Sequence, residues 1–163
     1  MNTKDSLKMA GDMSLFVLKK FIADVSDEEL LNRPAPGCNH LAWQLGHVIS
    51  SEVYLLNSIA PGAKIDFPPG FVENHAKGNK ASDDPAQFLK RDEYVALFDQ
   101  VRAATYEALD AMPDSKLDEP GPEAFRSVFP TVGHVAMLVM THPLMHSGQF
   151  AVSRRNLGKP IVI

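Results

Sequence analysis

The sequence contains a single cysteine, Cys38, which excludes an internal disulfide framework and any zinc site built from several thiolates. It also lacks long apolar runs and, near its start, the apolar core of a secretory signal peptide. There is no basic stripe, and the net charge is −4, so we expect no nucleic-acid partner. Together these absences predict a cytoplasmic protein that engages neither membranes nor nucleic acid.

The composition itself is that of an ordinary globular protein. Hydrophobic residues make up 45% of the 163 residues and charged residues 22%, which excludes general disorder. A chain of this length fits one domain and buries a sizeable core without disulfides or structural metals. We therefore expect residues 1–163 to form a single domain.

The twelve prolines divide the chain into stretches. They gather at 34–36, 61–85, 113–130 and 160, and only Pro143 interrupts the stretches between these zones. Proline is excluded from helix interiors because it lacks an amide hydrogen and clashes with the preceding turn. Apolar residues within the stretches recur at three- and four-residue spacing. The pattern predicts an all-α protein with four long helices, near 7–22, 40–60, 94–112 and 131–157.

Shorter signals refine this prediction. Ser26 and Glu29 have the spacing of a capping box that opens a short helix before Pro34. Asn39 is the expected cap of the second long helix. Residues 61–84 form a segment long enough to cross from one end of a bundle to the other. Such a segment is either a functional lid or a plain surface crossover.

His142 and His146 are four residues apart in the last predicted helix, so they differ by about 40° around its axis. Two imidazoles on one face at this spacing form a pattern that binds metal ions. The same face carries Gln149 and four apolar residues: Val135, Leu138, Val139 and Met145. This face is therefore predicted to point toward the core. The two histidines there either bind a metal ion or are buried and satisfied by hydrogen bonds. A metal site needs a third ligand from elsewhere.

His47 is the candidate third ligand. It lies midway along the second predicted helix, on a polar strip with Trp43, Gln44, Ser51 and Tyr54. The rest of that helix is apolar almost all round. The strip faces either an internal site or solvent, and in the second case the apolar faces would form an oligomer interface. We favour the internal site, because polar groups in pockets orient ligands.

The other histidines fit a shared site less well. His134 lies about 12 Å along the helix axis from His142, and His40 lies about 10 Å from His47. Both separations are too long for one ion whose bonds to nitrogen are about 2 Å. We expect His40 in the first turn of its helix or at a pocket rim. His75 is expected to be a solvated loop residue, with a fourth-ligand role as the alternative.

Three further residues have two interpretations each. Pro143 kinks the last helix, and the kink either aims His142 or is tolerated packing. Arg154 and Arg155 either bind an anionic substrate or complement a helix C-terminus, and we favour the helix terminus.

Two stretches of the sequence resemble the DinB-like superfamily of metalloproteins. The first is NHLAWQLGH at 39–47, preceded by SDEELL at 26–31 and RPAPG at 33–37. The second is HPLMHSGQ at 142–149, followed by RRNLGKP at 154–160. The order and spacing of the elements match that superfamily over nearly the whole chain.

The resemblance implies a four-helix bundle with a long crossover between helices two and three. It also implies a metal site of three histidines, which carry over onto His47, His142 and His146, with zinc or nickel as the typical ion. Dimers are common in the superfamily, and its characterised members include thiol-dependent S-transferases and a maleylpyruvate isomerase. Many relatives have an acidic residue after the first histidine of the helix-four pair. Pro143 stands there in this chain, so that carboxylate has no counterpart.

Three neutral imidazoles leave a divalent ion with an open coordination position, as in catalytic zinc sites. The pKa of a water or thiol bound there falls, which supports hydrolysis, thiol transfer or isomerisation. We expect Trp43, Ser51, Tyr54 and Gln149 to line the pocket of a homodimeric enzyme that acts on a small molecule. A low-molecular-weight thiol is a candidate cosubstrate. The alternatives are a metal-binding protein without turnover and a dimerisation module without metal.

Overall fold

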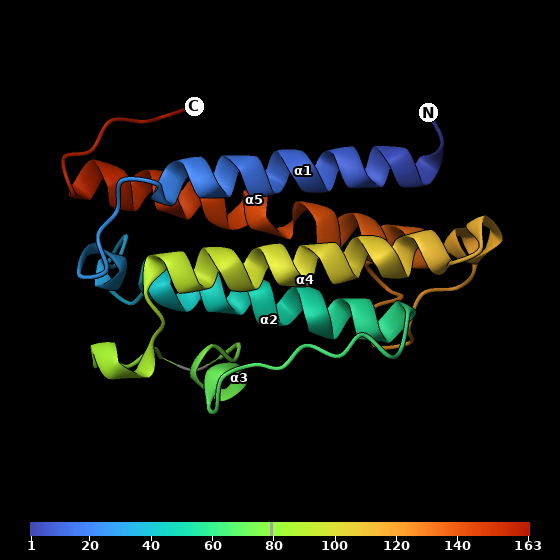
Figure 1. Ribbon diagram of the computed structural model, residues 1–163, viewed down its shortest axis with the longest axis horizontal. Helices are drawn as coiled ribbons and strands as arrows, with labels where there is room; N and C mark the ends of the chain where they lie inside the picture. The colour runs from blue at the N-terminus through green and yellow to red at the C-terminus, as the bar shows by residue number, and fades with distance from the viewer. Residues whose placement is uncertain (79) are drawn as a thin grey trace.

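The computed structural model describes residues 1–78 and 80–163, and its four long helices lie side by side (Figure 1). They are α1 (Thr3–Ile22), α2 (Leu41–Ile59), α4 (Arg91–Ala111) and α5 (Val132–Asn156). The shorter elements are α3 (Phe71–Asn74) and the 3₁₀ helices η1 (Glu29–Leu31), η2 (Pro85–Gln87) and η3 (Asp114–Asp118). Among the described residues there is no strand, only an isolated bridge between Pro120 and Thr131. Within the same residues, no helix combines the length and apolar character needed to cross a membrane. The predicted all-α four-helix bundle is confirmed.

The segment between α2 and α4 crosses the bundle lengthwise. Figure 1 shows it in green, returning along α2 from the end of that helix to the start of α4. Because of this return, α2 and α4 run in the same direction, and α1 and α5 run opposite to both. The predicted crossover between helices two and three is therefore confirmed. It carries α3 and η2, and α3 packs against α2.

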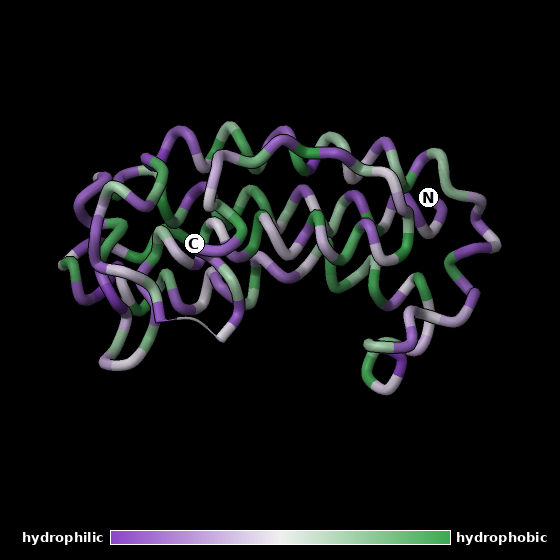
Figure 2. The backbone as a smooth tube through the Cα atoms, turned by 90° about the horizontal axis from the view of Figure 1, so that it is seen from below, coloured by the Kyte–Doolittle hydropathy of each residue, from purple (hydrophilic) through white to green (hydrophobic). Residues whose placement is uncertain are grey.

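α2 is buried on most of its sides. It packs against α4, α5 and α3, whereas α1 packs mainly against α5. Figure 2 shows hydrophobic and hydrophilic positions alternating along the long helices, as expected where one face is buried. Buried residues of α2 surround most of its axis: Leu41, Ala42, Trp43, Gln44, Leu45, Gly46, Val48, Ile49, Glu52, Leu55, Leu56 and Ile59. Packing within one chain therefore explains the apolar sequence of α2, and the homodimer stays a prediction.

The structure tests two of the predicted helix starts. At η1, the Ser26 amide donates to the Glu29 carboxylate at 2.8 Å, and the Glu29 amide donates to the Ser26 Oγ at 3.2 Å, so the capping box is confirmed. At α2 the prediction of Asn39 as cap is wrong. The cap is His40, whose Nδ1 accepts from the Trp43 amide at 3.1 Å. A neutral imidazole nitrogen thus takes the acceptor role that amide and hydroxyl oxygens usually fill.

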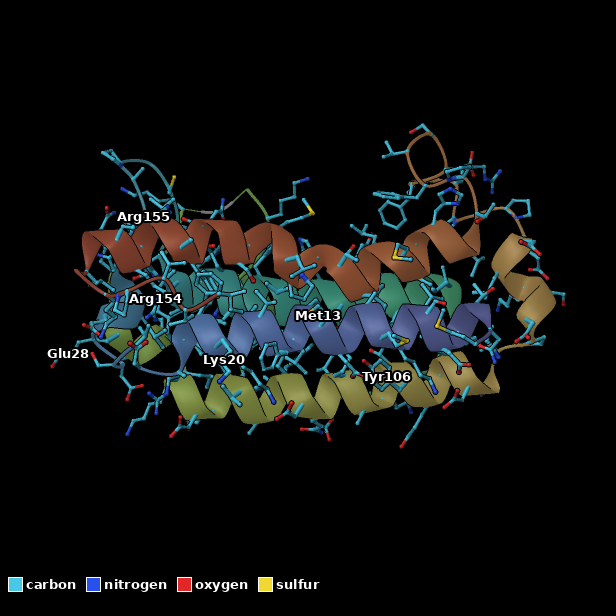
Figure 3. All side chains as sticks on the ribbon, turned by 90° about the horizontal axis from the view of Figure 1, so that it is seen from above. Met13, Lys20, Glu28, Tyr106, Arg154 and Arg155 are labelled. Atoms are coloured by element: carbon cyan, nitrogen blue, oxygen red, sulfur yellow. The ribbon has the colours of Figure 1, made fainter. Side chains whose placement is uncertain are left out.

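Arg154 of α5 binds the C-terminal end of α1. Figure 3 shows Arg154 pointing toward α1 and Arg155 pointing away. The buried Arg154 guanidinium donates to the carbonyls of Phe21 and Pro160, each at 2.8 Å, and pairs with Asp24. The structure thus supports the helix-terminus interpretation of Arg154, although the terminus belongs to α1 rather than to α5 itself.

Candidate metal centre

The structure brings together His47 of α2 with His142 and His146 of α5. One ligand atom of each lies within 4.8 Å of those of the other two, and the ring centroids are 5.0 to 5.5 Å apart. All three side chains are half-buried. No other group of three histidine, cysteine or acidic side chains in the described part of the chain is as close. The expected convergence is present, and metal binding stays a prediction.

α5 presents its two histidines on one face and bends beside them. The buried Pro143 lies inside the helix, and the ribbon changes direction near its middle (Figure 3). Two serine hydroxyl groups donate hydrogen bonds to backbone carbonyls near Pro143. Ser147 Oγ donates to the Pro143 carbonyl at 2.8 Å, and Ser14 Oγ of α1 donates to the Met140 carbonyl at 2.5 Å. Met145, predicted on the core face, is 66% exposed. That prediction is wrong because Met145 lies at the edge of the face, where it reaches solvent.

Two of the three imidazoles have an acceptor at Nδ1. The Nδ1 of His47 donates to the carbonyl of His75 at 3.2 Å, and the Nδ1 of His146 donates to the amide oxygen of Gln44 at a longer 3.4 Å. An acceptor at Nδ1 holds the ring hydrogen there and leaves the Nε2 lone pair free for a ligand. Sequence reasoning placed Gln44 on the polar strip without a role. The structure makes it the partner of His146.

His75 is a buried support of the site rather than a solvated loop residue. Its side chain is 1% exposed, its Nδ1 donates to the Phe71 carbonyl at 2.6 Å, and its Nε2 accepts from the Tyr94 hydroxyl at 2.8 Å. With both ring nitrogens occupied, His75 is not a fourth ligand in this structure. The ring fits because Gly46 has no side chain: a Cβ there would lie 2.2 Å from His75. Gly46, directly before His47, was the available signal in the sequence.

The remaining two histidines have structural contacts outside the cluster. The buried His40 caps α2, and its Nε2 donates to the Ser82 carbonyl at 2.9 Å. His134 is exposed in the first turn of α5, where its Nδ1 lies 2.8 Å from the Thr131 hydroxyl. Neither ring is part of the cluster, in agreement with the axial distances expected from the sequence.

Burial keeps the three clustered histidines neutral. Burial, together with the neighbouring histidines, lowers the pKa of His142 and of His146 to about 4. Burial also lowers the pKa of His47, although the His75 carbonyl opposes this effect. The positive charge of Lys77 contributes to the lowered pKa of His47 and of His142. Neutral imidazole is the form that binds a metal ion, so the cluster does not need to lose protons at pH 7.

A pocket of about 390 Å³ opens beside His47 and His142. Its other lining residues are Trp43, Ser51, Tyr54, Leu55, Lys77 and Leu138, and we call it the histidine pocket. The Trp43 ring stacks on His47, with centroids 4.7 Å apart and planes 7° apart. Trp43, Ser51 and Tyr54 line this pocket, whereas Gln149 is exposed and is not among its lining residues. Substrate binding by these residues stays a prediction.

Glu52, the acidic residue of α2 that follows His47, is turned away from the pocket. Its carboxylate accepts from Arg102 and from the Thr105 hydroxyl, each at 2.8 Å, inside the bundle core. This agrees with the angle of about 140° between His47 and Glu52 on an ideal helix. Glu52 is therefore unable to act as a general base at the histidine pocket.

Larger hollows lie elsewhere on the molecule. One of about 540 Å³ is lined by residues of 60–64 and 104–116, and another of about 440 Å³ lies beside Leu31 and Phe88. Neither is lined by a histidine. Convergent groups with shifted pKa values mark a functional pocket better than volume does, and they point to the histidine pocket.

Comparison with known proteins gives a family and a related fold. The family model of the DinB superfamily matches residues 16–150. Among solved structures, the chain is similar to YfiT from Bacillus subtilis, a probable metal-dependent hydrolase with an unusual four-helix bundle topology. The TM-score is 0.65 at 15% sequence identity, over 96% of this chain and 89% of that one. No curated protein matches the chain.

Proposed function

The chain belongs to the DinB superfamily, and on that premise we propose that it is a metal-dependent enzyme acting on a small molecule, of the hydrolase or thiol-dependent S-transferase type. The observation that carries the proposal is the convergence of three neutral imidazoles beside an open pocket. The similarity to YfiT, itself a probable metal-dependent hydrolase, supports the same class of chemistry.

The donor set fits a divalent ion. His47, His142 and His146 would hold it, and the Nδ1 contacts of His47 and His146 leave their Nε2 atoms as ligands. Imidazole suits both zinc and nickel. An ion held by three protein ligands supplies Lewis acidity, which polarises a substrate carbonyl or lowers the pKa of a substrate thiol.

The residues of the chain position the substrate. Trp43 fixes the plane of His47 by stacking on it and covers one side of the ring from water. The hydroxyl groups of Ser51 and Tyr54 lie at the pocket, where they can donate to a substrate oxygen or accept from a substrate thiol. The apolar Leu55 and Leu138 complete the walls. This arrangement binds and orients a small molecule next to the three histidines.

A metal-binding protein without turnover is the second candidate. The observation that favours it is that no carboxylate is present among the described residues lining the histidine pocket. Glu52 is engaged with Arg102, and Pro143 occupies the position after His142. Proton transfer would then depend on hydroxyl groups or on the substrate itself.

Metal content tests the site. We expect about one zinc or nickel ion per chain in the wild-type protein and none in His142→Ala, because two imidazoles do not complete a site. The control is His134→Ala, which removes an exposed histidine of the same helix and should leave the metal content unchanged. Failure of the wild-type protein to bind added zinc and nickel would overturn the proposal.

Two reactions then separate the candidate activities. One is hydrolysis of p-nitrophenyl acetate, and the other is the reaction of N-acetylcysteine with 1-chloro-2,4-dinitrobenzene. In the second, a carbon–sulfur bond forms, chloride leaves and the thiol proton passes to the buffer. Turnover should disappear in His142→Ala and in chelator-treated wild type, and it should return when the metal is added back to the wild type. Turnover that survives metal removal would refute the metal-dependent mechanism.

A further inference from the structure

Apart from its two imidazoles, the histidine pocket offers an ammonium group and two hydroxyl groups as hydrogen-bond donors. Lys77 is the only charged residue among the described residues that line it, and an ammonium group donates without accepting. Ser51 and Tyr54 add two hydroxyl groups. A ligand that satisfies these groups must be rich in acceptors.

Among the described residues, the charge that lines the pocket is positive. Lys77 is exposed and forms no ion pair with another described residue. The one acidic side chain of α2, Glu52, is neutralised by Arg102 in the core. A resident divalent cation would add further positive charge. An anion is therefore favoured over a neutral or cationic ligand.

The rest of the wall is apolar and aromatic. Leu55 and Leu138 lie there with the Trp43 ring, and the Tyr54 ring meets Phe125 edge-on at 6.1 Å. The volume of about 390 Å³ lies within the range of small-molecule pockets, which starts near about 300 Å³. The wall therefore suits a compact organic body rather than a bare inorganic ion.

We propose that the histidine pocket takes small organic anions whose apolar body lies against Trp43, Leu55 and Leu138 and whose acidic group pairs with Lys77. The inference rests on the proposed function in that the reacting group of such a substrate would face the three histidines. Lys77 then determines specificity: it selects the charge of the substrate without touching the reacting atoms.

The chain contains its own reporter for this proposal. Trp43 is the only tryptophan, so intrinsic fluorescence reports ligand binding at the histidine pocket. The probes are p-toluenesulfonate and methyl p-tolyl sulfone, which share an aryl group and differ in charge. We expect the metal-free full-length protein to bind the sulfonate roughly two- to fivefold more tightly, as suits a half-exposed ion pair. Added salt should reduce this preference.

Matched variants test whether Lys77 causes the tighter binding of the sulfonate. Lys77→Gln should abolish it, Lys77→Arg should keep it, and Lys80→Gln, an exposed lysine outside the pocket lining, should leave it unchanged. Equal binding of the two probes, a preference that survives in Lys77→Gln, or no response to either probe up to its solubility limit would overturn the proposal. Repeating the titration with zinc-loaded protein separates the two hypotheses. A Lys77-dependent preference in a chain that binds no metal would support the anion pocket and refute the metal enzyme.

Discussion

Gly46 is the residue at which the crossover segment reaches α2 beside the candidate ligands. The His75 ring occupies the space where a side chain of Gly46 would be, and the carbonyl of His75 accepts from the Nδ1 of His47. His75 is in turn fixed by the Phe71 carbonyl and the Tyr94 hydroxyl. Because Gly46 has no side chain, the crossover segment packs against α2 and α4, and the carbonyl of His75 sets the tautomer of His47.

Gly46→Ala should disturb both stability and metal binding. The new Cβ would lie 2.2 Å from the His75 ring, so the crossover segment must shift, at a cost of about 1–3 kcal/mol in the free energy of unfolding. Loss of the acceptor at His47 Nδ1 should weaken zinc binding by roughly ten- to a hundredfold. Urea denaturation and competition with a chelator of known zinc affinity measure the two effects.

Gly148→Ala is the matched control on α5. A Cβ at Gly148 meets no heavy atom within 4 Å, so alanine should stabilise the helix by about 0.5–1 kcal/mol and leave zinc affinity unchanged. Wild-type zinc affinity in Gly46→Ala would show that the His75 carbonyl does not position His47.

At the scale of the elements, α2 and α4 are joined by an ion pair in the middle of the bundle. Glu52 and Arg102 are 2.8 Å apart, with side chains only 1% and 3% exposed. Arg102 also donates to the Met140 sulfur of α5 at 3.3 Å and lies over the Tyr106 ring, with its Cζ 5.9 Å from the centroid. Removing two charges from water is costly, so the pair holds the helices in register rather than adding much net stability.

Removing one partner of this pair should therefore cost more than removing both. Arg102→Met should lower the free energy of unfolding by about 3–5 kcal/mol, because Glu52 stays buried without its cation. The double variant Glu52→Leu with Arg102→Met should recover most of that loss. The control is Lys19→Met, which breaks the half-exposed pair with Asp99 and should cost about 1 kcal/mol or less. A loss in Arg102→Met as small as in Lys19→Met would contradict the argument.

For the whole molecule, the sequence predicts the elements, the crossover and the histidine cluster, but not the contacts that His75 of the crossover makes with α2 and α4. Proline positions and apolar spacing locate the four helices, because both are local properties of the chain. Spacing within α5 and the polar strip of α2 identify the three histidines for the same reason. The prediction of a solvated His75 is wrong because its burial depends on Tyr94 and Gly46, which meet it only after the chain has folded. The Asn39 prediction is wrong because the side chain of the next residue, His40, makes the capping bond instead.

The buried His75 and the half-buried His142 and His146 also make the stability of the whole molecule depend on pH. The pKa of His75, His142 and His146 is about 4 in the folded chain, against 6.5 for an unperturbed histidine, and burial is the main cause. A folded pKa below the unfolded value means that the unfolded chain binds more protons between these two values. The stabilisation is therefore complete above about pH 6.5 and is lost as the pH falls toward 4.

The slope of stability against pH counts the protons involved. Near pH 5 the three histidines are protonated in the unfolded chain and neutral in the folded chain. Unfolding of the metal-free protein should therefore bind about three protons at these residues. Urea denaturation in steps from pH 7 to pH 4 gives the total proton uptake from the slope of the unfolding free energy. His40 and His47 add to this total, because burial lowers their pKa as well. His146→Asn should reduce the uptake by about one proton, because one buried imidazole is gone. If the slope is the same in the variant and the wild type, His146 does not remain neutral in the folded cluster. Wild-type stability that is constant over this range would contradict the burial of all three rings.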